Sequence, residues 1–290
     1  GSGAAPVSAV TAGAGCVWID LYHAVTTEAG RYVQGGGCTD VGVAGLVQSG
    51  GFGSFSKGFG TAASALLEAE IVTADGVARI CNAATNPNLF WAIKGGGGGS
   101  WGVVTRLTLR TYELPENFGA AWGTILAKSD DSFRALILHF LNFYRDNLLN
   151  PHWGEQFHIF PDNKLEISLV CQALADEEAK AVWKPFFEWV AQNPDLKAVG
   201  HLHARATPAR DWWTVKDNDS MIPDDRSGAP DYHGWWTGDQ GQVGVYLNSF
   251  DSLWLPATLL SPADALANAL FEASRFKKIE LHCNKGLAGA

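Results

Sequence analysis

The stretch GGGCTDVGVAG, residues 35–45, continues through SGGFG, residues 49–53, and decides how the fold of this chain is interpreted. A second stretch, GGGGGSWGVV, occupies residues 95–104. Glycine loses more backbone entropy on folding than any other residue, so a cluster of glycines indicates special dihedral angles or close approach of the backbone to a ligand. Two clusters in one short region favour a ligand site lined by backbone over turns that serve only the fold.

Two common nucleotide-binding motifs do not account for these glycines. Neither cluster ends in Gly-Lys-Ser/Thr, which excludes a phosphate-binding loop of the P-loop type. The spacing Gly97-x-Gly99-x-x-Gly102 matches a dinucleotide fingerprint by letter. That match follows a predicted helix and enters a predicted strand, which is the reverse of the order in a Rossmann unit.

The rest of the chain predicts an α+β protein with two domains. The first part predicts strands at residues 7–12, 66–73, 77–81 and 102–112, and helices at 17–29 and 88–94. After a boundary at 114–116, the second part predicts strands at 121–127, 157–160, 165–170, 243–248 and 278–283, and helices at 129–145, 176–191 and 262–273. Pro185 is expected to kink or break its helix. Residues 206–241, rich in Asp, Gly, Pro and Trp, predict a long loop.

The composition excludes several classes of partner. The chain has 290 residues and a formal net charge of −9, whereas nucleic-acid binding needs a basic stripe that neutralises phosphates. No apolar run approaches the ~20 residues that cross a bilayer. The five cysteines lack both CxxC pairing and a histidine at zinc-ligand spacing, so no metal site is predicted. We therefore expect a small-molecule ligand, and neither nucleic acid nor a membrane as partner.

Four segments carry a specific family resemblance. They are GGGCTDVGVAGLVQSGGFGSFSKGFG at residues 35–60, LLEAEIVTADG at 66–76, NPNLFWAIKGGGG at 86–98 and WGVVTRLTL at 101–109. In this order they resemble the flavin-binding domain of the berberine-bridge branch of the vanillyl-alcohol-oxidase superfamily. The resemblance implies that residues 1–114 are the second subdomain of a PCMH-type FAD-binding domain. It implies that residues 115–290 are an antiparallel-sheet substrate domain with flanking helices.

The resemblance also assigns positions that face the cofactor, FAD. In that family, backbone amides of glycine-rich loops hold the pyrophosphate and flank the isoalloxazine. Peptide N–H groups stabilise anionic phosphate and reduced flavin, and glycine lets them approach closely. Carried over residue by residue, the cofactor-binding positions are Gly37, Cys38, Thr39, Gly42, Val43, Gly50, Gly53, Gly102, Val103 and Val104.

The chain departs from the family pattern in three respects. The usual Cys-Pro-Thr-Val is CTDV at residues 38–41, which places Asp40 near the flavin, and the usual Asp-Asn is Ser64-Ala65. The family's first FAD subdomain, whose Gly-Gly-His loop binds the pyrophosphate, has no counterpart. The family's closing aromatic and Asn-rich segment is also missing. We therefore expect a chain that is incomplete at both ends, with the missing subdomain present as a separate chain or a cleaved segment.

The implied activity is that of an FAD-linked oxidase or dehydrogenase. A hydride passes from an alcohol or amine carbon of a sugar, phenolic or alkaloid-like substrate to flavin N5, and oxygen or another acceptor reoxidises the flavin. A base removes the proton of the adjacent hydroxyl or amine. The candidates are Tyr246, Glu280 and His282, all on predicted strands, and their spacing places Glu280 and His282 on one face. A structural role in a half-buried strand is equally compatible with each.

The Trp-rich loop leaves a second function open. The pairs Trp212-Trp213 and Trp235-Trp236 fit either a stacking platform for a sugar or phenolic substrate or packing of the loop onto the sheet. With the Gly-Gly-His subdomain missing, the chain also fits a non-catalytic fragment that acts as a carbohydrate- or protein-binding module.

Cys38 is the candidate for a covalent link to the flavin. Three glycines precede it, and a helix beginning near Val41 would lower the pKa of its thiol, whereas the charge of Asp40 acts in the opposite direction. The resemblance implies a thioether between this cysteine and the isoalloxazine. A free thiol that lines the flavin without bonding to it is the alternative.

Overall fold

The computed structural model describes residues 6–216, 218–242 and 251–283, and it divides into two compact units. Among the described residues, unit 1 contains 6–115 and 208–242, and unit 2 contains 116–207 and 251–283. The first division lies between Pro115 and Glu116. The return of residues 208–242 to unit 1 was not predicted from the sequence.

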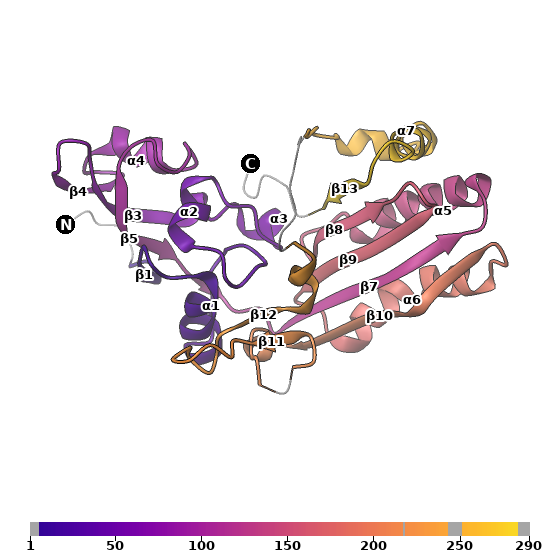
Figure 1. The fold of residues 1–290 in the computed structure, drawn as a ribbon, viewed down its shortest axis with the longest axis horizontal. Coiled ribbons are helices and arrows are strands. Elements are labelled where there is room, and N and C mark those ends of the chain that lie inside the picture. Colours follow the sequence, from indigo (N-terminus) through magenta and orange to yellow (C-terminus); the bar gives the residue numbers. More distant parts are fainter. Residues whose placement is uncertain (1–5, 217, 243–250, 284–290) are drawn as a thin grey trace. The chain divides into compact units, whose positions relative to one another are not determined.

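Unit 1 is built on a four-stranded antiparallel sheet in the order β1-β5-β3-β4 (Figure 1). In β3, Ala69 and Ile71 are buried while Glu68 and Glu70 are partly exposed, which is the alternation that a half-covered strand requires. The strands of this sheet are β1 (Ala9–Gly13), β3 (Leu66–Val72), β4 (Ala78–Asn82) and β5 (Val103–Arg110). Two further strands, β2 (Arg31–Tyr32) and β6 (Tyr112–Glu113), pair with each other in a separate sheet. The helices are α1 (Trp18–Leu21), continued by a π-helical segment Tyr22–Glu28, α2 (Val43–Gln48), α3 (Ser56–Phe59) and α4 (Pro87–Ile93).

Residues 208–242 pack on unit 1 through aromatic side chains. The short strands β11 (Met221–Pro223) and β12 (Gly234–Trp236) pair antiparallel within this segment. Trp213 is buried and stacks on Tyr22, with 3.9 Å between the ring centroids. Burial of aromatic rings stabilises the packing of residues 208–242 on the rest of unit 1, although residues 116–207 separate these two parts in the sequence.

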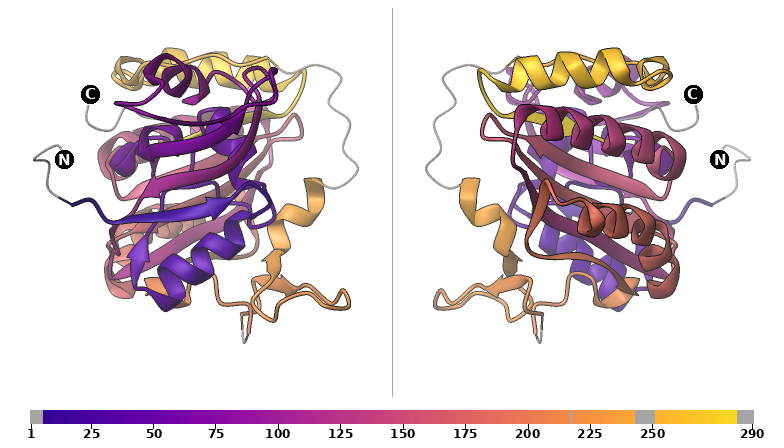
Figure 2. Two further views of the ribbon diagram at one scale, coloured as in Figure 1. Left: turned by 90° about the vertical axis from the view of Figure 1, so that its left-hand side faces the viewer. Right: turned by 90° about the vertical axis from the view of Figure 1, so that its right-hand side faces the viewer.

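Unit 2 is a five-stranded sheet in the order β10-β7-β9-β8-β13. Three helices lie on one face of this sheet (Figure 2), and the core lies between them and the sheet. The core is rich in large rings, among them the fully buried Trp153, Trp183 and Phe140. The strands are β7 (Asn117–Ala127), β8 (Trp153–Ile159), β9 (Lys164–Gln172), β10 (Leu196–Pro208) and β13 (Ile279–His282), and the helices are α5 (Asp130–Phe143), α6 (Asp176–Gln192) and α7 (Asp264–Ser274).

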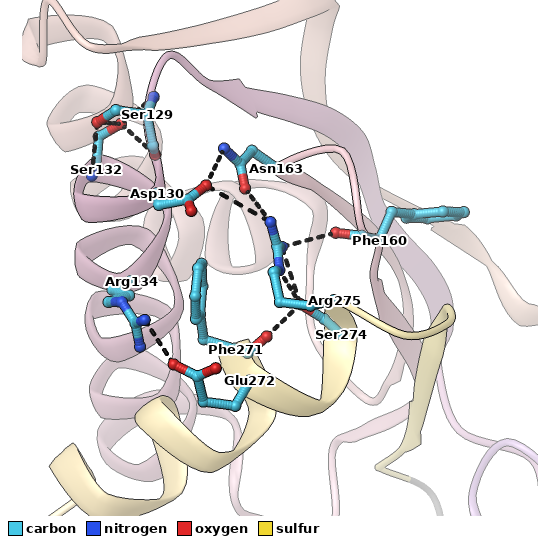
Figure 3. Close-up of polar contacts among 10 residues, drawn as sticks. All are labelled: Ser129, Asp130, Ser132, Arg134, Phe160, Asn163, Phe271, Glu272, Ser274 and Arg275. Atoms are coloured by element: carbon cyan, nitrogen blue, oxygen red, sulfur yellow. Dashed lines mark hydrogen bonds and ion pairs between the residues drawn. The ribbon is translucent and has the colours of Figure 1, made fainter.

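Arg275, directly after α7, joins that helix to the β8–β9 hairpin and to α5 (Figure 3). Its Nη1 donates to Asn163 Oδ1 at 2.8 Å and lies 3.6 Å from Asp130 Oδ1. Its Nη2 donates to the carbonyl of Phe160 at 3.3 Å, and the guanidinium lies 4.3 Å from the centroid of the Phe271 ring. The Arg275 side chain therefore donates hydrogen bonds to acceptors of the hairpin turn and also packs on an aromatic ring of the core.

The predicted α+β class is confirmed, and the differences have local causes. Pro185 lies inside α6 and does not break it; the proline stands ten residues into a helix whose buried side chains pack on the sheet. Strand β10 was missed: the exposed His201, His203 and Arg205 alternate with Leu202, Ala204 and Ala206, and the small alanine side chains make this apolar alternation weak. The strand predicted at 243–248 lies outside the described residues. No helix in the described ranges is long and apolar enough to cross a membrane.

Replacing Arg275 by Ala should destabilise unit 2 by about 1–3 kcal/mol, because the partly buried hairpin turn loses its donors and the rings lose a cation. Urea unfolding followed by tryptophan fluorescence measures this change. Lys184→Ala on α6 is the matched control: its ammonium is 3.8 Å from Glu188 and its side chain is 72% exposed, so it should change stability by no more than about 0.5 kcal/mol. Equal effects of the two substitutions would contradict the assigned role of Arg275.

Candidate functional site

The two ends of the glycine-rich stretch at residues 35–53 pack against each other through their backbones. A Cβ at Gly53 would lie 1.6 Å from the carbonyl oxygen of Gly35, and a Cβ at Gly35 would lie 2.3 Å from the Trp18 ring. The buried Ser56 hydroxyl accepts from the Gly53 amide at 2.9 Å and from Gln34 Nε2 at 3.1 Å. No side chain fits at either glycine, so both are required by the fold itself.

The loop at residues 37–43 is anchored on one side by the segment that enters α1. The amides of Trp18 and Ile19 donate to the carbonyls of Val41 and Thr39 at 3.0 and 2.9 Å, and the Val43 amide donates to Cys16 at 3.0 Å. Helix α2 begins at Val43 with Gly42 as its N-cap, two residues later than expected. Cys38 therefore lies in the loop rather than at the helix start, and the predicted helix-terminus effect on its thiol does not apply.

Residues 234–239 anchor the same loop from its other side. The buried hydroxyl of Thr39 donates to the carbonyl of Gly234 at 2.6 Å, and Trp236 Nε1 donates to the carbonyl of Gly37 at 3.1 Å. Burial raises the pKa of the Asp239 carboxyl, the side chain of Cys38 lowers it, and the charge of Asp40 raises it. Asp239 was not predicted, because about 200 residues separate it from Cys38 in the sequence.

The glycines predicted to face the cofactor fall into two kinds. Gly53 and Gly102 are closely packed: a Cβ at Gly102 would lie 2.4 Å from the carbonyl oxygen of Val72. A Cβ at Gly42 or Gly50 would meet nothing within 4 Å. Gly42 also has an ordinary backbone conformation, with φ −65° and ψ 129°, so neither strain nor packing requires glycine there. A ligand that approaches the backbone would account for glycine at position 42. The residues present fit an FAD cradle in this respect.

The second glycine cluster meets the first within unit 1. The Gly97 amide donates to the carbonyl of Gln48 at 2.9 Å, and a Cβ at Gly95 would be 3.4 Å from the Cα of Gly50. Beyond this cluster, Val103 is 69% exposed, whereas Val104 is buried in the sheet. The two clusters predicted to serve one ligand therefore lie together.

The candidate bases lie in unit 2, apart from Tyr246, which is outside the described residues. Glu280 and His282 share one face of β13, as predicted, and His282 Nε2 is 2.8 Å from Glu280 Oε1. The sequence analysis missed His158 on β8, whose Nε2 is 3.3 Å from Glu280 Oε2 and whose Nδ1 is 3.2 Å from Glu166. The His158 imidazole, followed by His282, holds the pKa of the Glu280 carboxyl far below its ordinary value.

These side chains project from the face of the sheet opposite the helices. Their neighbours along β8, β9 and β13, such as Phe157, Ile167 and Leu281, pack toward the helix-covered core instead. On the same open face, Trp122 of β7 stacks on His203 of β10 with 4.7 Å between ring centroids. Among the residues that the structure describes, no three His, Cys, Asp or Glu side chains are placed to hold a metal ion.

The four tryptophans of the two pairs differ in how far they are buried. Trp213 is buried and serves as core packing. Trp212 and Trp236 are half-buried, with ring centroids 5.4 Å apart, and Trp235 is also half-buried. Trp236 is held in place by its bond to Gly37. Trp213 therefore has a packing role, and a stacking role for the other three tryptophans stays a prediction.

Comparison with known proteins matches this geometry to a family. Residues 7–82 match the family described as "FAD binding domain". The FAD-linked oxidoreductase malF of Malbranchea aurantiaca is 50% identical over 109 residues, which cover 37% of this chain and 18% of that protein. The VAO-type flavoprotein MtVAO615 of Myceliophthora thermophila superposes with a TM-score of 0.67 at 21% identity, over 94% of this chain and 47% of its own. The chain carries an FAD-binding domain and has the fold of a VAO-type flavoprotein.

A second solved structure is also similar to this chain. The glucooligosaccharide oxidase of Acremonium strictum superposes with a TM-score of 0.54 at 21% identity, over 69% of this chain and 40% of its own. The predicted resemblance is confirmed by the match of residues 7–82 to the FAD binding domain and by the 50% identity to malF over 109 residues. The chain spans less than half the length of each of the three proteins compared.

Replacing Thr39 by Val should loosen the loop at residues 37–43 from the 208–242 segment. The substitution leaves the Gly234 carbonyl buried without its donor, which costs about 1–3 kcal/mol. Limited proteolysis within 208–242 should be faster, and urea unfolding should shift to a lower midpoint. Thr39→Ser keeps the hydroxyl and should resemble the wild type; a valine variant as resistant as the serine variant would show that this bond does not hold the segment.

Proposed function

We propose that this chain binds FAD along the loop at residues 37–43 and takes part in FAD-dependent oxidation of an alcohol or amine. The observation that carries the proposal is Gly42, where the fold leaves open space beside a backbone that has no need of glycine. Amide groups beside such a glycine can approach an anionic phosphate or the flavin ring closely. FAD supplies the hydride acceptor, and the chain supplies position and proton transfer.

His282 is the base that we assign among the predicted candidates. A carboxylate whose pKa is held far below its ordinary value is a weak proton acceptor, which argues against Glu280. An imidazole whose Nε2 faces a carboxylate keeps Nδ1 for the proton of a substrate hydroxyl or amine. His282 is also one-third exposed on the open face of the sheet, where a substrate can reach it. Tyr246 stays a prediction as an alternative base.

The open face of the unit 2 sheet offers contacts for a ring-shaped substrate. Trp122 provides an aromatic surface, and the guanidinium of Arg205 lies 5.3 Å from its centroid. A sugar or a phenolic ring stacks on such a surface, and an alkaloid-like ring does so equally well. The similarity to a glucooligosaccharide oxidase supports a sugar among these classes.

We assign Cys38 as the residue that bonds covalently to the flavin. The Acremonium strictum enzyme carries a 6-S-cysteinyl, 8α-N1-histidyl FAD. In this chain Cys38 lies in the loop at residues 37–43 and its side chain lowers the pKa of the Asp239 carboxyl. With FAD bound, Cys38 would supply the sulfur: a C–S bond would replace one ring C–H, and two protons and two electrons would pass to dioxygen, giving hydrogen peroxide.

The first test is the reduction of bound flavin. The purified chain should show the visible absorption of FAD, and a substrate should bleach it in stopped flow. His282→Ala should retain the colour and slow the bleaching by roughly 10²–10⁴-fold, the usual worth of a positioned base. His139→Ala, which removes a ring stacked on Trp189 in unit 2, is a control that should leave the rate unchanged. A chain that binds no FAD would favour the non-catalytic binding module, and an unaffected rate would place the base elsewhere.

The second test concerns the covalent bond. Acid precipitation of the holoprotein should leave the flavin colour in the pellet, and Cys38→Ala should release it. Cys16→Ala, in the segment that anchors the same loop, is the matched control and should keep the colour in the pellet. Complete release of flavin from the wild type would contradict the covalent bond while leaving FAD binding intact.

A further inference from the structure

Four side chains form a row across three strands on the open face of the unit 2 sheet. Glu280 of β13 stands opposite His158 of β8, and His158 stands opposite Glu166 of β9. His282, two residues beyond Glu280 on β13, continues the row on the same face. We call these four residues the carboxylate–imidazole row. Its members alternate between groups that only accept hydrogen bonds when ionised and rings that can donate.

His158 lies in the row with a carboxylate at each ring nitrogen. Its Nδ1 is 3.2 Å from Glu166 Oε1, and its Nε2 is 3.3 Å from Glu280 Oε2. The second contact has the distance of an ion pair but not the angle of a hydrogen bond, since Nε2 has no hydrogen-bond partner. The side chain of His158 is only 9% exposed. A carboxylate therefore faces each ring nitrogen of His158, which holds the ring between β9 and β13.

Both carboxylate oxygens of Glu280 lie close to nitrogen atoms of neighbouring side chains. Oε1 faces His282 Nε2 at 2.8 Å, and Oε2 faces His158 at 3.3 Å and Lys278 Nζ at 3.2 Å. A carboxylate held at both oxygens cannot rotate freely. The facing groups favour its ionised form, in agreement with its lowered pKa. Because an ionised carboxylate only accepts, the ring nitrogen that faces it must carry a proton.

We propose that Glu280 is a positioning residue that holds His282 as the Nε2-protonated tautomer, with Nδ1 as the proton acceptor. His158 and Glu166 fix Glu280 in the orientation that this requires. A carboxylate that orients a catalytic imidazole sets its tautomer in the same way in other enzymes. The inference rests on the proposed function, in which His282 is the base. It adds three residues, Glu280, His158 and Glu166, that fix the tautomer and the orientation of this base.

Nitrogen NMR of the FAD-loaded full chain tests the tautomer directly. At a pH at which His282 is neutral, its Nε2 should show the shift of a protonated nitrogen and its Nδ1 that of an unprotonated one; His282→Ala identifies the signals. Glu280→Ala should convert them to a mixture of tautomers, and Glu280→Gln, which keeps an acceptor oxygen, should retain the wild-type pattern. Glu188→Ala, on the exposed side of α6, is the control and should change nothing.

The rate of flavin reduction supplies the second readout. Glu280→Ala should slow reduction by roughly 10- to 100-fold, the range found when the partner of an oriented imidazole is removed, while FAD absorption is retained. His158→Gln should give an intermediate tautomer mixture and a smaller loss of rate.

Two outcomes would overturn the proposal, and they are distinguishable. An Nδ1-protonated His282 in the wild type, or an unchanged tautomer in Glu280→Ala, would refute the positioning role even if FAD binds and is reduced. A wild-type tautomer as expected, together with normal reduction in His282→Ala, would refute the assignment of the base instead.

Discussion

The contact of Gly53 with the carbonyl of Gly35 is the constraint on which unit 1 depends. It leaves no room for a side chain, so the two halves of the glycine-rich stretch close on each other through their backbones. The closure places the loop at 37–43 between the α1 segment and residues 234–239, which supply its hydrogen bonds. A loop fixed on both sides can present its amides to a ligand without paying for ordering on binding.

The structure gives the glycines of this stretch two separate roles. Some, such as Gly35 and Gly53, permit packing that any Cβ would prevent, whereas Gly42 borders open space. The second kind leaves room for a ligand at the backbone, so one short segment can both build the domain and form its candidate FAD site. Unit 2 contributes a different feature, a sheet with one face covered by helices and an open face that carries titratable side chains.

Local patterns predicted the fold well, and long-range pairing limited what could be predicted of the site. Alternation and turn residues placed the β8–β9 hairpin, and the i, i+2 spacing placed Glu280 and His282 on one face. The partner His158 could not be found this way, because the register of β13 against β8 joins residues more than 120 positions apart. Asp239 was missed for the same reason, since residues 208–242 return to unit 1 through tertiary contacts that leave no periodic signal.

Hydrogen exchange with and without FAD tests the central claim, that the loop at 37–43 and its anchors form the flavin cradle. FAD should slow amide exchange at residues 37–43, 50–53 and 234–239, because bound ligand and a fixed loop suppress local opening. Helices α5 and α6, in the core of unit 2, should exchange at the same rate in both states. Protection of residues 37–43 by FAD is the predicted result. Binding of FAD with unchanged exchange at 37–43, and protection elsewhere, would contradict the account.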